Sequence, residues 1–371
     1  MYITPYLKEV DRICEQCDFE QPDSDFASKS TELKGHLYAG HNVAATHSLF
    51  YLLDDVALEL IRDRNYSLIV DEAINTIGRL NVTEKDFQLI VEQLADVEDS
   101  GKLRWRDPDY CGKFTGYKEA VDTGSVHLLD NALLNILNPE ILRSFDEVFM
   151  LTYLFDGQYQ KAYLECFGFE YRVIGVIQDD GGFRFSDRPD DPPPIDYSGL
   201  IHIVGTPKMN APGDPYYALS RNWYLTHRYE SPDMRSLRNG MKNFFLNMTQ
   251  GGSDERLWTC FKEGCGKLLD KNGRFRSNYL QISARATNEY RGRTDLAYMV
   301  NRFADPNLKK FFANRGCVID EERFALSEML QWIWRGAIRD DRPINLYIPS
   351  SRMRKLLTDW IDQASEGGGR S

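Results

Sequence analysis

The feature that most constrains the fold is an alternation of short apolar strands and helices in the first 75 residues. Strands are predicted at 2–5 (YITP), within 41–48 and at 66–73 (YSLIVDEA). Helices are predicted between them, at Tyr6–Cys17 and over 49–63, where apolar residues recur at helical spacing. Strands that alternate with helices favour a parallel sheet with right-handed crossovers. The sequence therefore begins in an α/β domain.

The alternation continues to the end of the chain, interrupted once. The strongly apolar strand at 147–155 (EVFMLTYLF) suits the centre of a sheet. Residues 83–147 are predicted to be an insertion with a helix at Glu84–Ala95, a hairpin and a second helix at Leu128–Ile136. Further strands are predicted at 171–177, 200–205, 281–287 and 344–350, and further helices at 158–168, 233–249, 294–303, 306–314 and 325–339.

Charge is distributed unevenly between the two halves. Residues 1–200 carry 18 Lys+Arg against 37 Asp+Glu, a net of −19, whereas residues 201–371 carry 27 against 19, a net of +8. A basic half joined to an acidic one is typical of a protein that meets an anion such as a nucleic-acid backbone. Basic residues on solvated helices explain the same count equally well.

Several classes of protein are disfavoured by the composition. No stretch approaches 18 uncharged apolar residues, so no membrane span is expected, and MYITPYLKEV lacks the pattern of a secretory signal. Seven scattered cysteines suit reduced thiols in a cytoplasmic protein better than a disulfide framework.

Two adjacent carboxylates, Asp71 and Glu72, follow the apolar run Leu68–Val70. At the end of a buried strand such a pair suits Mg²⁺, which prefers hard oxygen ligands and keeps several waters. Asp-Glu after an apolar run is also common by chance, and a capped strand end is the simpler interpretation of the pair alone.

Near the C-terminus, Gln331, Arg335 and Arg339 recur every four residues, which predicts that they share one helical face. Guanidinium groups bind phosphate oxygens bidentately and offset charge that develops during phosphoryl transfer. A surface helix with solvated arginines is the alternative.

Six segments together resemble the successive motifs of superfamily-two DEAD/DEAH-box-like helicases, closest to the helicase-like proteins of phages and mobile elements. The resemblance implies two RecA-like domains in tandem, at 1–155 and 156–371. It also implies ATP and Mg²⁺ as cofactors and nucleic acid, DNA more than RNA, as partner, with phage or replication proteins as further partners. The segments are ITPYLKEVDRI, ATHSLF, LIVDEA, MLTYLF, ATNEYRGR and MLQWIWRGAIR.

The resemblance also implies roles for individual residues. Asp71 would hold Mg²⁺ and Glu72 would polarise the attacking water, with ATP between these carboxylates and arginines of the second domain. Arg335 is the better finger candidate than Arg339, because the spacing of the two arginines departs from the family pattern. Thr152 and Gln331 would line the nucleotide site. Residues implied to contact nucleic acid are Thr4, Thr46, His47, Thr287, Asn288, Arg291 and Arg293, although Thr46-His47 suits a helix N-cap equally well.

The phosphate loop of that family, G-x-x-x-x-G-K-[ST], occurs nowhere in the 371 residues. The interpretation from sequence is an N-terminally truncated first domain that binds ATP weakly and hydrolyses it poorly, since loop amides and a lysine provide most of the grip on the phosphates.

Three alternatives remain open at this stage. A catalytically inert nucleic-acid-binding or interaction protein could retain the same fold. A phage nuclease or packaging motor would need clustered carboxylates in the second half, which the sequence does not display. A zinc site would combine Cys14 and Cys17 with Cys260 and Cys265, pairs that lie far apart in sequence.

Overall fold

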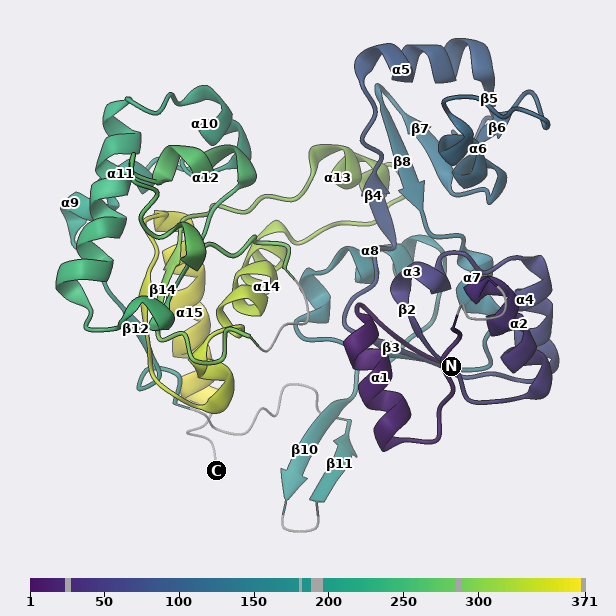
Figure 1. Cartoon of the computed structure of the whole chain (residues 1–371), viewed down its shortest axis with the longest axis horizontal. Helices are drawn as coiled ribbons and strands as arrows, with labels where there is room; N and C mark the ends of the chain where they lie inside the picture. The colour runs from purple at the N-terminus through teal and green to yellow at the C-terminus, as the bar shows by residue number, and fades with distance from the viewer. Residues whose placement is uncertain (24–27, 180–181, 188–195, 285–288, 368–371) are drawn as a thin grey trace. The chain divides into compact units, whose positions relative to one another are not determined.

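The structure is a computed structural model that describes residues 1–23, 28–179, 182–187, 196–284 and 289–367. The chain forms two compact units, which are described separately (Figure 1). The first unit comprises Met1–Phe169 and Asp305–Ile319, and the second comprises Glu170–Ala304 and Asp320–Ser371.

This division differs from the expected boundary between residues 155 and 156. The segment Asp305–Ile319 returns to the first unit because its helix α13 (Pro306–Ala313) buries Leu308, Phe311 and Phe312 in that unit's core. Helix α8 (Tyr159–Cys166), which lies beyond the expected boundary, buries Ala162, Tyr163 and Leu164 in the same core.

A four-stranded parallel sheet forms the centre of the first unit, as the sequence predicts. Its order is β2-β1-β3-β9. Helix α1 covers one face through Val10 and Ile13, and helices α2 and α4 cover the other face with apolar side chains. The strands are β1 (Tyr2–Thr4), β2 (Ala44–Thr46), β3 (Leu68–Asp71) and β9 (Val148–Leu151), and the helices are α1 (Leu7–Gln16), α2 (Lys29–Ala39), α3 (His47–Phe50), α4 (Asp55–Asp63) and α7 (Pro139–Arg143).

Two details of this unit differ from expectation. The helix predicted over 49–63 is broken before α4, because the Asp54 carboxylate accepts a hydrogen bond from the amide of Ala57 at 3.0 Å and caps α4. Strand β9 lies at an edge of the described sheet rather than at its centre. Val148 and Met150 pack on the core, but Phe149 and Leu151 are 40% and 50% exposed.

The expected insertion forms a small lobe with its own apolar core. Residues 128–136, predicted as a helix, instead contain most of a hairpin. Strands β7 and β8 pair Leu129 with Ala132 across a two-residue turn, in which Asp130 adopts φ +49°. Asp tolerates this left-handed conformation, so the turn overrides the helical pattern. The elements of the lobe are β4 (Ile77–Arg79), α5 (Glu84–Leu89), the π-helical turn η1 (Ile90–Leu94), β5 (Ala95–Val97), β6 (Leu103–Trp105), α6 (Thr115–Asp122), β7 (Val126–Leu129) and β8 (Ala132–Ile136).

The second unit contains another four-stranded parallel sheet, in the order β12-β15-β14-β13. The helix predicted at 294–303 is wrong, since Asp295–Tyr298 is the fully buried strand β14. Residues 281–284 of the strand predicted at 281–287 are not extended into a strand, and the rest lies outside the described residues. The strand predicted at 171–177 contributes to a separate antiparallel hairpin of β10 (Gly175–Asp179) and β11 (Gly182–Ser186).

The remaining elements of the second unit follow the expected alternation of strands and helices. Strands are β12 (Ile201–Ile203), β13 (Arg256–Thr259) and β15 (Ile344–Tyr347), and helices are α9 (Pro207–Asn210), α10 (Arg221–Thr226), α11 (Pro232–Asn243), α12 (Lys262–Leu268), α14 (Glu321–Ile333) and α15 (Ser351–Gly367). Within the described residues, no helix combines the length and apolar character needed to cross a membrane.

Candidate functional site

A polar residue ends or directly follows every strand of the first sheet. The parallel register aligns Thr46 with Thr4, and it places Asp71 beside Leu151, directly before Thr152. Ile3 pairs with Val70 in parallel register. The next residue on each strand, Thr4 on β1 and Asp71 on β3, therefore lies at the same level of the sheet. Four of the positions singled out by sequence therefore lie in one row at the carboxyl edge of this sheet.

The row crosses a reversal in strand order. The chain passes from β1 to β2 on one side, then to β3 on the other side of β1, and onward to β9. Helix α1 leaves β1 toward one face, whereas Ile74 after β3 is buried in the core of the opposite face. In open α/β sheets, ligands bind where adjacent connections diverge in this way. Thr4 and Asp71 flank that point.

The Asp71 carboxylate faces groups on β1 and α1. Burial of Tyr2, together with this carboxylate as charge and hydrogen-bond acceptor, raises the pKa of the Tyr2 hydroxyl. Arg12 lies within electrostatic range of Tyr2 and Asp71, while its Nε donates to Glu9 Oε2 at 2.7 Å. Asp71 is thus a half-buried carboxylate with a phenol donor at hand.

Neighbouring Glu72 has a left-handed backbone, with φ +61°. A non-glycine residue in this region carries steric strain, and such residues cluster at functional sites. The amide of Glu72 donates to the Leu151 carbonyl at 3.2 Å, which ties the strained residue to β9. The left-handed turn at Glu72 therefore follows directly after Asp71, the last residue of β3.

His47 and Thr46 hold the end of β2 in place. The Thr46 hydroxyl accepts a hydrogen bond from the Leu49 amide at 3.3 Å, which is the helix N-cap that the sequence offered as an alternative. His47 is buried, and its Nε2 lies 3.1 Å from the main-chain oxygen of Asp71. His47 thus connects the ends of β2 and β3 across β1.

Thr152 is fixed from the side of α8. Its hydroxyl accepts a hydrogen bond from Gln158 Nε2 at 2.6 Å, and the same nitrogen donates to the Tyr153 carbonyl at 2.8 Å. The buried Gln158 therefore shapes the turn that follows β9. Sequence reasoning gave Gln158 no role.

Thr4 differs from the other residues of the row. Its side chain is fully buried, and its hydroxyl has no hydrogen-bond partner among the described residues. An unsatisfied buried hydroxyl is unfavourable and is itself a pointer to a ligand or water. Carboxylate and hydroxyl oxygens are the donors that Mg²⁺ prefers, so the residues at this edge fit that ion.

In the second unit, the expected helical face of Gln331, Arg335 and Arg339 is not formed. Helix α14 ends at Ile333, and Arg339 lies on the separate 3₁₀ turn η7 (Ala337–Asp340). Gly336 between them packs tightly, since a side-chain carbon there would lie 2.9 Å from the Arg293 carbonyl. Gln331 is exposed on α14, and its Nε2 donates to Ser327 Oγ of the same helix at 3.2 Å.

The turn after α14 nevertheless gathers other predicted residues. The Ala337 amide donates to the Arg293 carbonyl at 2.8 Å, and Arg291 forms an ion pair with Asp340. Arg335 is buried and Arg339 is exposed. These arginines lie before the amino ends of β14 and β15. Thr287 and Asn288 lie outside the described residues.

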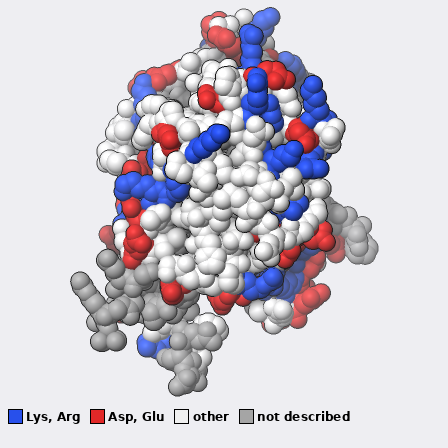
Figure 2. Space-filling view, turned by 90° about the vertical axis from the view of Figure 1, so that its left-hand side faces the viewer, with Lys and Arg blue, Asp and Glu red and all other residues white. Residues whose placement is uncertain are grey.

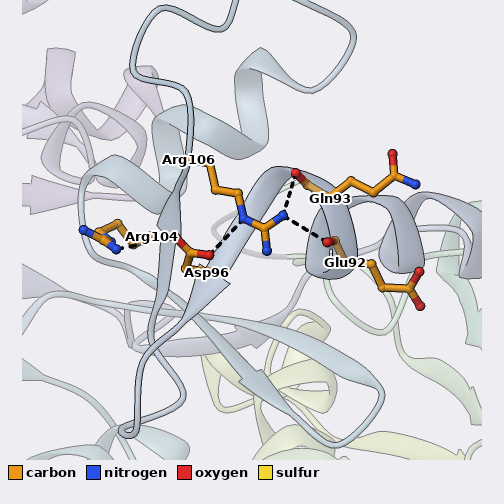
Figure 3. Close-up of polar contacts among 5 residues, drawn as sticks. All are labelled: Glu92, Gln93, Asp96, Arg104 and Arg106. Atoms are coloured by element: carbon orange, nitrogen blue, oxygen red, sulfur yellow. Dashed lines mark hydrogen bonds and ion pairs between the residues drawn. The ribbon is translucent and has the colours of Figure 1, made fainter.

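Basic residues of the inserted lobe are used within the lobe (Figure 3). Arg106 Nε donates to Asp96 at 2.9 Å, and its Nη1 donates to the carbonyls of Glu92 and Gln93 at 3.0 and 2.9 Å. Arg104 reaches the same carboxylate at 3.4 Å. Arg106 therefore ties the β5–β6 hairpin to the end of η1, whereas Arg104 pairs across the hairpin itself.

The zinc alternative gains no support. Among the described residues, no group of three or more His, Cys, Asp or Glu side chains is arranged to hold a metal ion. Cys260 and Cys265 lie close enough for their thiols to hydrogen bond to each other, which lowers the pKa of Cys265 to about 7. Cys14 and Cys17 belong to the first unit.

Sequence reasoning missed Tyr2 and Arg12. The signal for Tyr2 was present, because it pairs with Ile69, two residues before Asp71, on the same face of the sheet. Arg12 reaches the site from a helix, and no sequence spacing indicates such a contact.

Comparison with known proteins places the chain in a family. Residues 196–361, most of the second unit's sheet domain, match the family described as the YonV C-terminal Rossmann-like domain. A curated relative, the "SPbeta prophage-derived uncharacterized protein YonV" of Bacillus subtilis (strain 168), is 34% identical over 380 residues, covering 98% of this chain and 92% of the relative. The chain therefore belongs to the YonV family, a phage-type protein with an α/β fold and a Rossmann-like C-terminal domain.

Proposed function

We propose that this protein is a helicase-related nucleoside triphosphatase of phage type that acts on nucleic acid, DNA rather than RNA. The observation that carries the proposal is the row of polar residues at the carboxyl edge of the first sheet, with Asp71 and Glu72 at the reversal in strand order. The two units would then be RecA-like domains. The prophage origin of the relative and the net positive charge of residues 201–371 favour a nucleic-acid substrate.

In this proposal, Asp71 holds Mg²⁺ through its carboxylate, and Thr4 offers a hydroxyl beside it. Bound Mg²⁺ supplies positive charge to phosphate oxygens. Glu72, in the left-handed turn directly after Asp71, orients the water. His47 positions the main chain of Asp71 from the neighbouring strand. Thr152 lies at the outer end of the row, held by Gln158.

The arginines of the second unit take the electrostatic role. Arg335 remains the proposed finger, although it is buried in the turn after α14 rather than displayed on the helix. Arg291 and Arg293 would contact the nucleic-acid backbone beside that turn. Arg291 already has an acidic partner in Asp340, so phosphate must compete with a carboxylate there.

Weak turnover is part of the proposal. The 371 residues contain no G-x-x-x-x-G-K-[ST] loop, whose amides and lysine otherwise grip the β- and γ-phosphates. Nucleotide affinity would therefore depend mainly on the carboxylate-bound Mg²⁺.

One observation favours the second candidate, a catalytically inert protein that binds nucleic acid with the same fold. The Asp71 carboxylate already has two partners, the Tyr2 hydroxyl as hydrogen-bond donor and the nearby positive charge of Arg12. In an inert protein these contacts are the carboxylate's permanent partners.

Glu72→Gln separates the two candidates. If the protein is an enzyme, ATP hydrolysis in the presence of single-stranded DNA falls at least tenfold in this variant while DNA affinity is retained. Glu147→Gln, at the amino end of β9, is the control and is expected to keep the wild-type rate. Equal hydrolysis by wild type and Glu72→Gln excludes the catalytic role of Glu72, and absence of hydrolysis in both favours the inert protein.

A further inference from the structure

Two neighbouring tyrosines are displayed on the second unit. Tyr216 and Tyr217 are 53% and 69% exposed, and they lie in the loop between the turn η3 (Ala211–Gly213) and α10. The loop meets residues that follow β14 and β15, since Asn301 lies just beyond β14 and Ser351 begins α15. The tyrosines are therefore at the carboxyl edge of the second sheet, where ligands of open α/β sheets bind.

The loop is held by buried polar contacts. Asn301 is fully buried, and its Nδ2 donates to the carbonyls of Tyr216 and Ala218 at 2.7 and 3.0 Å. The Asn301 amide donates to the carbonyl of Leu219, which has φ +63°. The hydrogen bonds of the buried Asn301 therefore hold this turn, including the left-handed backbone of Leu219, in place. The exposure of the two rings is therefore a defined feature of the fold.

Phe303 and Arg352 support the rings from below. The Phe303 ring lies 5.7 Å from that of Tyr216 and 5.5 Å from that of Tyr217, between centroids. The Arg352 guanidinium lies 4.5 Å from the Phe303 centroid. Its Nη1 donates to Asn301 Oδ1 at 3.1 Å, whereas its Nε has no hydrogen-bond partner within the described residues, although the side chain is only 8% exposed. We call Tyr216, Tyr217 and Phe303 the tyrosine platform.

Cationic and acidic side chains both lie near the platform, at the start of α15. Helix α15 begins beside it, with Arg354 and Lys355 in its first turns. A long helix carries a partial positive charge at this end, where the Ser350 hydroxyl accepts from the Met353 amide at 3.4 Å. These cations also have acidic partners: Asp214 lies 3.9 Å from Arg354, Asp359 pairs with Lys355, and Glu328 pairs with the neighbouring Arg302 at 3.0 Å. Single phosphates therefore meet local competition, and stacking must provide part of the affinity.

We propose that the tyrosine platform stacks the bases of single-stranded nucleic acid, whose phosphates run past the start of α15. Bases in a duplex are already stacked, so only unpaired bases offer a face to exposed rings. Stacking is also tolerant of sequence, which suits a protein that moves along a strand. This inference rests on the proposed function. It adds contacts to the bases, whereas the arginines near the turn after α14 would contact only the nucleic-acid backbone.

Figure 2 shows one face of the molecule, on which charges of both signs are mixed. On that face, Lys and Arg side chains alternate with Asp and Glu around an uncharged centre, and among the described residues no continuous basic patch covers it. A purely electrostatic track would require clustered cations.

The test measures binding of a fluorescein-labelled dT oligonucleotide by anisotropy, without nucleotide, for the wild type and three variants. Tyr217→Ala is expected to weaken binding about 5- to 150-fold, the range seen for loss of one base–aromatic stack, and Tyr217→Trp to retain it. Tyr38→Ala is the matched control, since Tyr38 in the first unit is also 69% exposed. It is expected to bind as the wild type does.

An abasic oligonucleotide of equal length distinguishes stacking from phosphate binding. It is expected to bind the wild type weakly and to be insensitive to Tyr217→Ala. Equal affinity of the wild type for the dT and abasic strands overturns the platform, as does an unchanged affinity in Tyr217→Ala. Either result leaves hydrolysis dependent on Glu72 untouched, so the platform and the proposed function fail separately. A wild type that binds no oligonucleotide refutes the platform and the nucleic-acid substrate together.

Discussion

Replacing Thr4 by valine separates a ligand-binding hydroxyl from a structural one. Thr4 is fully buried at the end of β1, beside Asp71, and its hydroxyl has no partner among the described residues. Valine has nearly the same shape but replaces the hydroxyl with a methyl group. The substitution therefore removes an unpaid desolvation cost without opening a cavity.

The magnitude follows from the cost of an unsatisfied buried group, about 1–3 kcal/mol. Allowing for the imperfect exchange of hydroxyl for methyl, we expect Thr4→Val to stabilise the first unit by about 1–2 kcal/mol. For a domain of this size, that corresponds to a rise of about 2–8 °C in melting temperature. If the hydroxyl serves Mg²⁺ or phosphate, the same variant loses nucleotide affinity while it gains stability.

Calorimetry of the full chain and titration with a fluorescent ATP analogue measure the two effects. Thr259→Val is the matched control, because Thr259 ends β13 in the second unit and is likewise fully buried with an unpaired hydroxyl in the described structure. It is expected to stabilise the second unit without changing nucleotide affinity. A less stable Thr4→Val, or one with undiminished nucleotide affinity, refutes the assignment of Thr4 to the site.

Three further predictions address the stability of the two units and the proposed phosphate contact of Arg291. Burial and the nearby Arg315 and Lys102 charges lower the pKa of His127 below its usual 6.5, so the stability that its neutral form contributes is fully present above about pH 6.5 and is lost as pH falls. The melting temperature of His127→Gln should therefore depend less on pH between 7 and 5 than that of the wild type. An unchanged pH dependence contradicts this prediction. Gly213→Ala would place a methyl carbon against the Pro349 carbonyl and 2.8 Å from the Ser350 amide, destabilising the second unit by about 1–3 kcal/mol, whereas Gly35→Ala, with open space on α2, should be neutral or stabilising in thermal melts. Arg291→Ala should change stability by less than about 1 kcal/mol, since its pair with Asp340 is exposed, but should reduce the salt dependence of DNA binding by about one ion; an unaltered slope argues against a phosphate contact.

Periodicity and strand order could be obtained from the sequence wherever local and tertiary preferences agree. The first three strands and α1 agree because their apolar residues face a core formed by sequence-near neighbours. The hairpin at 126–136 was misjudged because a turn at Asp130 outweighs the helical spacing of leucines. Strand β14 was misjudged because DLAYMV is buried on both faces and shows no alternation.

The candidate site was predictable in part for the same reason. Carboxyl ends of parallel strands meet at one edge, so Thr4, Thr46, Asp71 and Thr152 could be grouped from strand order alone. The four-residue spacing of the arginines was misleading, because α14 ends at Ile333 and the close approach of Gly336 to Arg293 starts a new turn. Contacts such as Tyr2 to Asp71 and Asn301 to Tyr216 depend on tertiary packing, which no local pattern encodes.

The central claim is that the carboxyl edge of the first sheet binds a Mg²⁺–nucleotide through Asp71. The most direct measurement is equilibrium titration of the protein with a fluorescent ATP analogue, in Mg²⁺ and in chelator, for wild type, Asp71→Asn and the control Asp146→Asn at the opposite edge of the sheet. We predict Mg²⁺-dependent binding by wild type and control that is at least tenfold weaker in Asp71→Asn. Equal binding by all three proteins, or binding that chelator leaves unchanged, would contradict the account.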